Sequence, residues 1–462
     1  MVRTRIAPSP TGYPHIGTIY QALFNFAFAK KNNGTFFIRI EDTDRARFVE
    51  GAEEVIFEAI DWFGLTENES SRKGGKHGPY RQSERLEIYH KHAQALLDKD
   101  LAYFAYYPKG DAGQKKEYTR NISEEKKETT EIPPKTIAEM IRRGDWILRM
   151  RVPKDKETTV HDEIRGDIVF TPDQVTEQVL VKSDGFPTYH LAAIVDDHLM
   201  GVTHVVRGEE WISSAPKHVL LYQYFGWEIP LLFHTPLLRN PDKSKLSKRH
   251  GHTDVRWYQE EGYLPEAILN FLALMGWTHP EEKEIFSMEE FISLFELKAI
   301  RQVGPIFDLT KLTWMNGEYI RKMDRESLVA TLKEFYTSTD QSLDSIDKKT
   351  LVAIVSIAHS RIATLKEFYP LISHFLPEAQ FHVNTLEDKK IVGTLQDEFI
   401  KIDKWNKETI LEALRVVLKT HSIRMPILYT IITGHERGLP LPESLEILGK
   451  ETTLDRLDKA LS

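Results

Sequence analysis

A glycine- and proline-rich turn between a strand pattern and a helix pattern is the feature that most constrains the fold. Residues 4–7 suit a short strand, residues 8–18 read PSPTGYPHIGT, and residues 19–31 carry apolar side chains at helical spacing. A helix that begins after such a turn presents backbone N–H groups to a bound anion. His15 adds a ring donor, and Gly17 leaves space where a nucleotide could approach. The segment therefore indicates a strand–turn–helix unit with an anion site.

Strand-like and helix-like runs alternate on both sides of a β-rich stretch. Before residue 108, we expect strands at 35–40 and 101–107 and helices at 52–63 and 83–97. Short antiparallel strands are expected at 146–152, 158–160 and 167–171. Alternation then resumes, with strands at 178–181 and 204–207 and helices at 189–199 and 213–225. This order predicts an α/β protein in which a parallel sheet is split by an insertion.

The remaining segments differ from this alternating pattern. Residues 108–135 are rich in Lys, Glu, Asp, Gly and Thr, and we expect them to form a solvated excursion. From about residue 240 the pattern is mostly helical, with helices expected at 265–275, 288–297 and 312–320. Several amphipathic helices are expected in residues 321–462. The chain is therefore expected to end in an all-α region.

Length and composition set broad limits on the protein class. A chain of 462 residues is expected to hold about two to four domains. It has no apolar run long enough to cross a membrane, and the early strand leaves no room for a signal peptide. Because the chain has no cysteine, we expect a cytoplasmic protein without disulfides or thiolate metal sites. The net charge of −8 does not decide whether nucleic acid binds, since only the local field at a contact surface matters.

A second motif lies far downstream of the first. Residues 243–249 read KSKLSKR and form a basic loop after an Asn-Pro-Asp turn. Residues 8–18 resemble the HIGH signature, and residues 245–249 resemble the KMSKS signature, of class I aminoacyl-tRNA synthetases. Thr18 departs from the fourth HIGH position, a variant that occurs among the glutamyl enzymes.

Flanking sequence narrows the resemblance to glutamyl-tRNA synthetases of the bacterial type. The matching runs are RIAPSPTG at 5–12, RIEDTD at 39–44 and YHLAAIVDDHLMG at 189–201. The resemblance extends from residue 3 to about residue 320 and continues more weakly to the end. It implies ATP-dependent activation of glutamate to glutamyl-adenylate, followed by transfer to the terminal ribose of glutamate tRNA.

The resemblance also implies a domain order and a set of ligands. It implies a Rossmann-type catalytic core at 1–98 and 187–239, an α+β acceptor-stem-binding insertion at 99–186, a stem-contact region at 240–320 and an α-helical anticodon-binding region at 321–462. The implied ligands are L-glutamate, glutamate tRNA, and ATP with Mg²⁺. We expect a monomer that does not associate with a membrane.

Activation joins a carboxylate to the α-phosphate of ATP, so it needs orientation and charge stabilisation rather than a nucleophilic side chain. The resemblance implies that His15, Lys245 and Lys248 are catalytic. It implies that ATP contacts His15, Gly17, Glu210, Trp211 and Lys248. The two lysines would close on the β- and γ-phosphates, with contacts strongest in the transition state. The alternative for the lysines is an inert solvated loop.

Glutamate brings two carboxylates and one ammonium, so its site should hold two cations and one anion. Arg5 and Arg207 each end a predicted strand, where open α/β sheets bind ligands, and Ala7 shares the face of Arg5. The resemblance implies the glutamate-binding set Arg5, Ala7, Ser9, Glu41, Tyr189, Ala193 and Arg207. In that set Arg5 and Tyr189 hold the side-chain carboxylate, and Arg207 faces the α-carboxylate. The alternative is a structural Arg5–Glu41 salt bridge beside a core tyrosine.

The resemblance implies tRNA contacts at both ends of the chain. Asp44 and Arg47 resemble positions that meet the 3′ end of the tRNA. Arg361 resembles an arginine that discriminating relatives place near the last anticodon base, and its alternative is a solvated helix arginine. The charging of glutamine tRNA stays open.

Metal sites are not expected. The Asp-Asp-His run at 196–198 lies on a predicted helix, and we do not expect it to bind a transition metal. Some relatives hold zinc through cysteines in the insertion, but this chain has Tyr103, Tyr106 and Tyr107 there, so no zinc is expected.

Four other functions compete with glutamate–tRNA ligation. A truncated paralogue that modifies a tRNA base would lack residues 321–462, and a glutaminyl enzyme would not need two arginines for a dianionic substrate. A catalytically altered tRNA-binding relative is disfavoured because His15, Glu41 and Lys248 are present. A nucleotidyltransferase with a HIGH-type turn would not need the helical C-terminal part.

Overall fold

The computed structural model describes residues 1–107, 131–246 and 253–462. The chain forms two compact units. The first unit comprises Met1–Trp257 and Leu269–Asp308, and the second comprises Tyr258–Ile268 and Leu309–Ser462. In the described ranges, no helix is long and apolar enough to cross a membrane.

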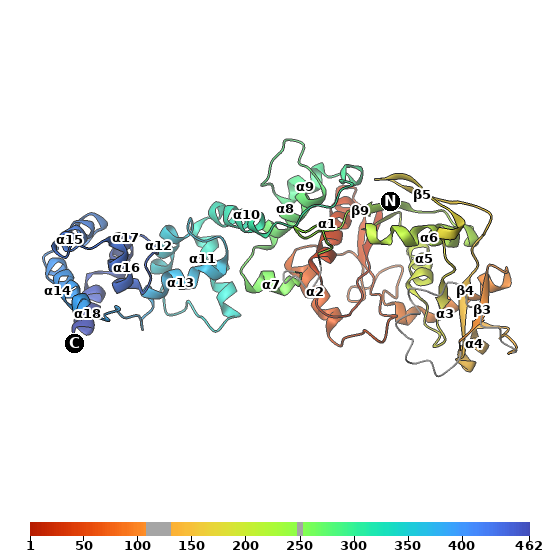
Figure 1. The fold of residues 1–462 in the computed structure, drawn as a ribbon, viewed down its shortest axis with the longest axis horizontal. Helices are drawn as coiled ribbons and strands as arrows, with labels where there is room; N and C mark the ends of the chain where they lie inside the picture. The colour runs from red at the N-terminus through yellow and green to blue at the C-terminus, as the bar shows by residue number, and fades with distance from the viewer. Residues whose placement is uncertain (108–130, 247–252) are drawn as a thin grey trace. The chain divides into compact units, whose positions relative to one another are not determined.

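Parallel strands joined by helices form the centre of the first unit (Figure 1). Strand β1 (Arg3–Ile6) pairs in parallel with β2 (Thr35–Ile38), and α1 (Ile16–Lys31) connects them. Strand β8 (His204–Gly208) pairs in parallel with β9 (Leu231–Thr235), and α6 (Ala215–Phe225) connects those two. The N–H of Thr203 donates to the carbonyl of Arg3 at 3.1 Å, so the start of β8 lies beside β1. The predicted α/β class with parallel strands is confirmed.

Strand β9 was not among the predicted strands. Its five residues, LLFHT, follow a proline and carry only three apolar side chains in a row, which is too short a run to distinguish strand from helix. Its strand conformation is fixed by the register with β8, in which Arg207 lies opposite His234. A long-range pairing therefore decides this element.

Segments between the two parallel pairs form two different sheets. The antiparallel strands β3 (Ala102–Tyr106), β4 (Trp146–Met150) and β7 (Val179–Val181) form one sheet, beside α4 (Ile137–Arg143). The antiparallel hairpin β5 (Thr158–Asp162) and β6 (Gly166–Phe170) instead extends the other sheet, with the order β6-β5-β9-β8. In that sheet Asp162 lies opposite Leu232. The sequence pattern predicted antiparallel strands at 146–152, 158–160 and 167–171, whereas it placed 101–107 and 178–181, which contain β3 and β7, in the alternating pattern. It could not show which sheet β5 would join.

Further helices of the first unit cover or flank these strands. They are α2 (Ala52–Trp62), α3 (Leu86–Asp98), α5 (Tyr189–Leu199), α9 (Met288–Leu294) and the 3₁₀ turn η4 (Glu209–Ser214). Two helices, α7 (Val255–Glu260) and α8 (Pro265–Gly276), each contribute residues to both units.

The described part of the second unit is helical. Its helices are α10 (Leu309–Lys322), α11 (Arg325–Thr337), α12 (Lys348–Ala358), α13 (Phe368–Ile372), α14 (Leu386–Ile400), α15 (Lys407–Thr420), α16 (Met425–Thr433), α17 (Leu441–Leu448) and α18 (Lys450–Leu461). Four of them begin at a capping side chain that accepts from a backbone N–H of the first turn: Asp324, Asp347, Thr385 and Asn406. The predicted all-α C-terminal region is confirmed.

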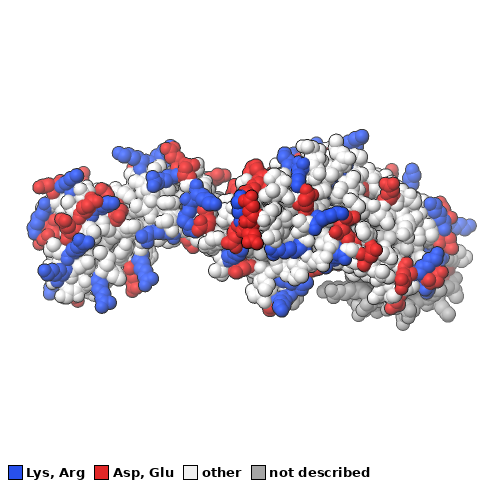
Figure 2. Space-filling view, turned by 90° about the horizontal axis from the view of Figure 1, so that it is seen from above, with Lys and Arg blue, Asp and Glu red and all other residues white. Residues whose placement is uncertain are grey.

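Charged side chains of both signs cover the molecular surface in view. Figure 2 shows Lys and Arg side chains interspersed with Asp and Glu over that face. The visible charge pattern therefore does not by itself mark a nucleic-acid surface, in keeping with the net charge of −8.

A buried histidine in the second unit makes stability depend on pH. His374 is 6% exposed, and its carbonyl accepts from Nη1 of the buried Arg456. Burial, with the nearby Arg456 and His435, lowers the pKa of His374 to about 4. The folded protein therefore keeps this ring neutral at a pH where the unfolded chain protonates it.

We predict that the free energy of unfolding falls as the pH drops from 6.5 towards 4. Over this range His374 is protonated in the unfolded chain but stays neutral in the folded protein. The loss approaches about 1.4 kcal/mol per pH unit for this one group, or about 3 kcal/mol in total. Urea unfolding of the parent and of His374→Leu at several pH values measures it. The parent should have the steeper pH dependence over that range, and equal slopes would contradict the prediction.

Candidate active site

A cavity of about 400 Å³ opens at the carboxyl ends of β1 and β8. This is the edge at which open α/β sheets bind ligands. The cavity is lined by Arg5, Ile6, Ala7, Pro8, Ser9, His15, Gly17, Thr18, Tyr20, Gln21, Glu41, Tyr189, Val206, Arg207, Gly208, Glu210, Trp211, Pro236, Leu237, Leu238, Lys245 and Leu246. Most of the residues predicted for ATP and glutamate are therefore brought together by the fold.

The first helix begins at the cavity with His15 as its cap. Nδ1 of His15 accepts from the N–H of Gly17 at 2.9 Å. A Cβ at Gly17 would lie 3.0 Å from that nitrogen, so glycine suits this close approach. Because Nδ1 accepts, the proton of the neutral ring is on Nε2. The helix thus presents its N-terminus and a ring N–H at the cavity.

A hairpin brings the basic loop to the same cavity. The N–H of Leu246 donates to the carbonyl of Leu238 at 3.0 Å, and Nζ of Lys245 lies 3.5 Å from Oε1 of Glu210. Beyond the gap in the described residues, the carbonyl of Thr253 accepts from the N–H of Ile16 at 2.8 Å. Lys248 lies outside the described residues. The residues on both sides of the KMSKS-like segment therefore adjoin the HIGH-like turn.

Aromatic and glycine residues shape the wall of the cavity. The rings of Tyr189 and Trp211 pack with their centroids 4.2 Å apart. A Cβ on Gly208 would overlap the carboxylate of Glu210, so a larger residue there would displace that side chain. Glu210 and Trp211, the two residues predicted to adjoin the adenosine, lie in η4, which begins directly after Gly208 at the end of β8.

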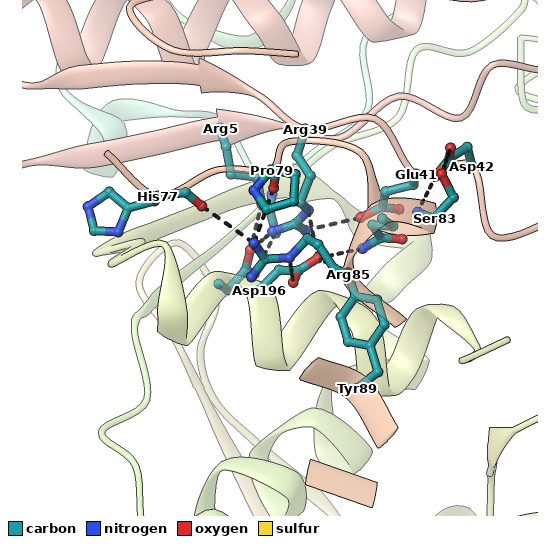
Figure 3. A network of polar contacts seen from close by, with 12 residues as sticks. Arg5, Arg39, Glu41, Asp42, His77, Pro79, Ser83, Arg85, Tyr89 and Asp196 are labelled. Atoms are coloured by element: carbon teal, nitrogen blue, oxygen red, sulfur yellow. Dashed lines mark hydrogen bonds and ion pairs between the residues drawn. The ribbon is translucent and has the colours of Figure 1, made fainter. Parts of the chain in front are cut away.

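A buried ion network lies beneath this cavity (Figure 3). It contains three guanidinium groups and three carboxylates: Arg5, Arg39, Arg85, Asp196, Asp197 and Glu41. Their formal charges cancel. The network is further satisfied by Gln82 and by the hydroxyl of Tyr89, both of which donate to Asp196. A buried network of this kind is stable only when every member is paired.

Arg5 is part of this network as well as of the cavity wall. Its Nε and Nη2 donate to the two oxygens of Asp197 at 3.1 and 2.8 Å. Glu41 is bound instead by Nη2 of Arg39 at 3.0 Å, so the expected alternative of an Arg5–Glu41 salt bridge is wrong. Although burial opposes it, the two arginines Arg5 and Arg39 hold the pKa of Asp197 below its ordinary value.

Glu41 is the carboxylate of the network that reaches the cavity. It is 9% exposed, and burial raises its pKa above the ordinary value despite the opposing effect of Arg39 and Arg5. A cation bound in the cavity would favour the ionised form of this carboxyl group. Glu41 is therefore placed to receive an ammonium group.

Arg207 differs from the other buried arginines because it is surrounded by neutral groups. Its Nε donates to Nε2 of His234 at 3.0 Å, and its Nη1 contacts Nδ1 of His218 at 3.0 Å and the hydroxyl of Tyr189 at 3.3 Å. Its Nη2 is buried and has no hydrogen-bond partner in the part of the chain that the structure describes. Within that part, Arg207 forms no ion pair with a carboxylate either.

The two histidines cannot neutralise the charge of Arg207. Burial, assisted by Arg207, lowers the pKa of His218 well below its ordinary value. Burial also lowers the pKa of His234, although Asp162 opposes this shift. Both rings therefore stay neutral near pH 7, so the guanidinium has only neutral groups in direct contact, and the carboxylate of Asp162 is separated from it by the ring of His234.

Other predicted site residues lie outside the cavity. Ala193 is buried on α5, one helical turn beyond Tyr189, and is 1% exposed. Asp44 and Arg47 form an exposed ion pair at 2.7 Å. Arg361 belongs to the second unit, where its Nη1 donates to the carbonyl of Gly438 at 3.2 Å.

The sequence missed the residues that support the two arginines. His218, His234 and Asp162 reach Arg207 directly or through one neighbour, and Asp197 holds Arg5. Of these, only Asp197 lies in a run that resembles the family. The Asp-Asp-His run is not arranged as a ligand set, because Asp196 and Asp197 bind arginines and the ring of His198 stacks on Trp227. Among the described residues, no group of three His, Cys, Asp or Glu side chains could hold a metal ion.

Comparisons with known proteins agree with this geometry. Residues 1–314 match the family model for the catalytic domain of class I tRNA synthetases (E and Q), and residues 327–461 match an anticodon-binding domain. The chain is 45% identical to a glutamate–tRNA ligase of Thermus thermophilus, with 100% of both chains covered. It is 40% identical to one of Fusobacterium nucleatum, covering 99% of this chain and 96% of the relative.

A solved structure also has the same fold. The glutamate tRNA ligase of Elizabethkingia meningosepticum, crystallised in complex with its amino acid, superimposes with a TM-score of 0.82 at 33% identity. The match covers 100% of this chain and 99% of the other. The chain therefore belongs to the glutamate–tRNA ligases, within the class I aminoacyl-tRNA synthetases.

Proposed function

We propose that the cavity activates L-glutamate with ATP and then transfers the glutamyl group to the 3′-terminal ribose of glutamate tRNA. The observation that carries this assignment is the charge of the cavity wall. Two arginines, Arg5 and Arg207, line the cavity, and Arg207 has no carboxylate in direct contact among the described residues. Glutamate brings one carboxylate for each arginine and one ammonium for Glu41.

The same argument disfavours glutamine as the substrate. Both amino acids bring an α-carboxylate for Arg207 and an ammonium for Glu41 and Ser9, so these groups do not distinguish them. Glutamine brings no side-chain carboxylate for Arg5 and Tyr189, and the charge-assisted part of that contact is lost. The cavity thus favours an amino acid with an anionic side chain.

Each carboxylate of glutamate has an arginine within the cavity. Arg5 and Tyr189 line one wall and are assigned to the side-chain carboxylate, and Arg207 is assigned to the α-carboxylate. Burial raises the pKa of Tyr189, with Glu41 contributing, so its hydroxyl keeps its proton and can donate it in a hydrogen bond. Ala7 leaves space between these groups. Ala193 is not among the residues that line the cavity, and its contact with glutamate stays a prediction.

ATP is assigned to the part of the cavity between His15 and Trp211. The N-terminus of α1, with Gly17, and the Nε2–H of His15 would bind phosphate oxygens, and Glu210 and Trp211 would adjoin the adenosine. An oxygen of the glutamate α-carboxylate then attacks the α-phosphorus, and pyrophosphate leaves. Lys245, together with Lys248, would stabilise the charge that grows on the departing pyrophosphate.

The second step and the remaining partners complete the proposal. A hydroxyl of the terminal ribose attacks the activated carbonyl, and AMP leaves. Asp44 and Arg47 are assigned to the 3′ end of the tRNA, and residues 321–462 to its anticodon. We assign Mg²⁺ as the ion carried by ATP, no zinc because the insertion has no cysteine, a monomeric state and a cytoplasmic location.

We predict that Arg207→Gln weakens the binding of glutamate and of glutamine alike, because both bring the α-carboxylate that is assigned to Arg207. The loss in kcat/KM for glutamate should correspond to roughly 2–5 kcal/mol, the range for truncating one partner of a buried charge pair. ATP–pyrophosphate exchange with each amino acid, in the presence of tRNA, measures it. Arg142→Gln, at an exposed position, is the control. An unchanged kcat/KM for glutamate would remove Arg207 from the glutamate site.

We predict that Lys245→Ala and Lys248→Ala each lower kcat by roughly 10²-fold, because the lysines act on charge that develops in the transition state. Nζ of Lys245 makes only a long contact with Glu210, and its side chain is 59% exposed, so this substitution should leave the fold intact. Steady-state kinetics at saturating ATP test it, with the exposed Lys99→Ala as control. A raised KM for ATP at a parental kcat would show uniform binding instead.

We predict that the parent charges glutamate tRNA in preference to glutamine tRNA and that Arg361→Gln reduces this preference. A bidentate arginine contact with a base is worth about 1–3 kcal/mol of discrimination. The bond from Arg361 to the carbonyl of Gly438 supports the alternative of a purely structural arginine. Aminoacylation of both tRNAs by the parent, Arg361→Gln and Arg361→Lys separates the two. Efficient charging of glutamine tRNA by the parent would refute the discriminating assignment.

A further inference from the structure

A buried chain of three side chains runs from a turn in the sheet to the cavity arginine. Oδ2 of Asp162 lies 2.7 Å from Nδ1 of His234, and Nε2 of His234 lies 3.0 Å from Nε of Arg207. Asp162 and His234 are 0% exposed, and Arg207 is 7% exposed. Asp162 is on β5, His234 on β9 and Arg207 on β8, so three neighbouring strands each contribute one member.

The hydrogen-bond chemistry of this chain allows only one tautomer of His234. A guanidinium group has donors only, so Nε2 of His234 must accept from Arg207. The proton of the neutral ring is therefore on Nδ1, where the carboxylate of Asp162 accepts it. Asp162 therefore fixes the ring of His234, and the ring in turn fixes Nε of Arg207. Arg207 itself contacts no carboxylate directly in the described structure.

Backbone groups fix the carboxylate itself. Oδ1 of Asp162 accepts from the N–H groups of Ile164 and Arg165 at 3.0 and 2.8 Å. Oδ2 also accepts from the N–H of His234 at 2.9 Å. Each oxygen therefore receives two donors, and the side chain cannot rotate without losing several hydrogen bonds at once.

Contacts at Nη1 also restrict the guanidinium of Arg207, but by themselves they do not fix its plane. Nη1 of Arg207 is shared between His218 and Tyr189, and Nη2 has no described protein partner. Without an acceptor at Nε, the guanidinium could rotate relative to the rest of its side chain. Nη2 would then point in a different direction. The bond from Nε to His234 is thus the contact that fixes the orientation of the fork.

We propose that Asp162 and His234 are positioning residues, which fix the orientation of the Arg207 guanidinium so that its fork meets a substrate carboxylate. This inference rests on the proposed function, in which Arg207 binds glutamate. It assigns part of the substrate affinity of the site to the hairpin formed by β5 and β6, whose residues do not line the cavity.

Two substitutions at His234 separate orientation from simple packing. The amide of His234→Asn reaches the place of Nδ1 and can still donate to Asp162, but it leaves Nε of Arg207 without an acceptor. The longer His234→Gln places an amide oxygen near the position of Nε2 and can still accept from Arg207. Both variants are smaller and more polar than histidine, so a packing defect would affect them alike.

The expected result is a split between the two variants in KM for glutamate. His234→Asn should raise that KM roughly 10- to 100-fold, the loss of one hydrogen bond to a charged group, with the KM for ATP unchanged. His234→Gln should stay within a few-fold of the parent. Equal glutamate KM values for the two variants, whether parental or raised, would overturn the positioning role.

The tautomer of His234 can be tested on the parent protein. A variant is needed only to assign the resonance. In protein labelled with ¹⁵N-histidine, the ring of His234 should give the nitrogen shifts of a neutral imidazole protonated at Nδ1. The resonance is assigned by its loss in His234→Gln. A ring protonated at Nε2, or a charged ring, at pH 7 would overturn the inference. Arg207→Gln distinguishes this failure from failure of the proposed function, because the latter requires Arg207→Gln to bind glutamate normally.

Discussion

The buried pairing of Arg5 with Asp197 is the interaction on which the rest of the site depends. Neither group could be buried alone, since breaking such a pair costs about 3–5 kcal/mol. Asp197 also binds Arg39, and Arg39 in turn binds Glu41. The pair therefore fixes the position of Glu41 in the cavity wall. The pair joins β1 to α5, two elements that are far apart in sequence. The packing of β1 against α5 and the shape of the cavity wall therefore depend on the same pair.

The contrast between Arg5 and Arg207 explains how one cavity can be both stable and receptive. Arg5 is neutralised by the protein and adds shape and hydrogen-bonding capacity at the wall. Arg207 is held by two neutral imidazoles and a phenol, which contact its Nε and Nη1 and leave Nη2 without a described partner. In the proposed function, Nη2 is the donor that remains for a substrate carboxylate. Arg5 is thus the arginine that stabilises the fold, and Arg207 is the one proposed to provide affinity for the substrate.

The sequence predicted secondary-structure elements, and the face of a strand on which a residue lies, better than it predicted contacts between residues far apart in the chain. Helix 189–199 was predicted with the bounds observed, and Arg5 and Ala7 both line the cavity as strand alternation requires. The partner of Arg5 could not be predicted, because Asp197 lies 192 residues away and no periodicity relates the two. His234 was missed for the same reason, since a short strand with one histidine becomes informative only when β8 and β5 are placed beside it. Residues whose role depends on a contact between strands are therefore the ones that local patterns omit.

The hairpin of β5 and β6 has a consequence for how this enzyme can be divided. By position in the chain it belongs to the insertion, yet it extends the sheet that contains β8 and β9. Through Asp162 it supplies a buried carboxylate to the neighbourhood of Arg207. The segment predicted as an insertion is accordingly not structurally separate from the sheet beside the cavity. A chimera that exchanges it with that of a relative must retain residues 158–170 with the catalytic core, or it also exchanges the residues that hold Arg207.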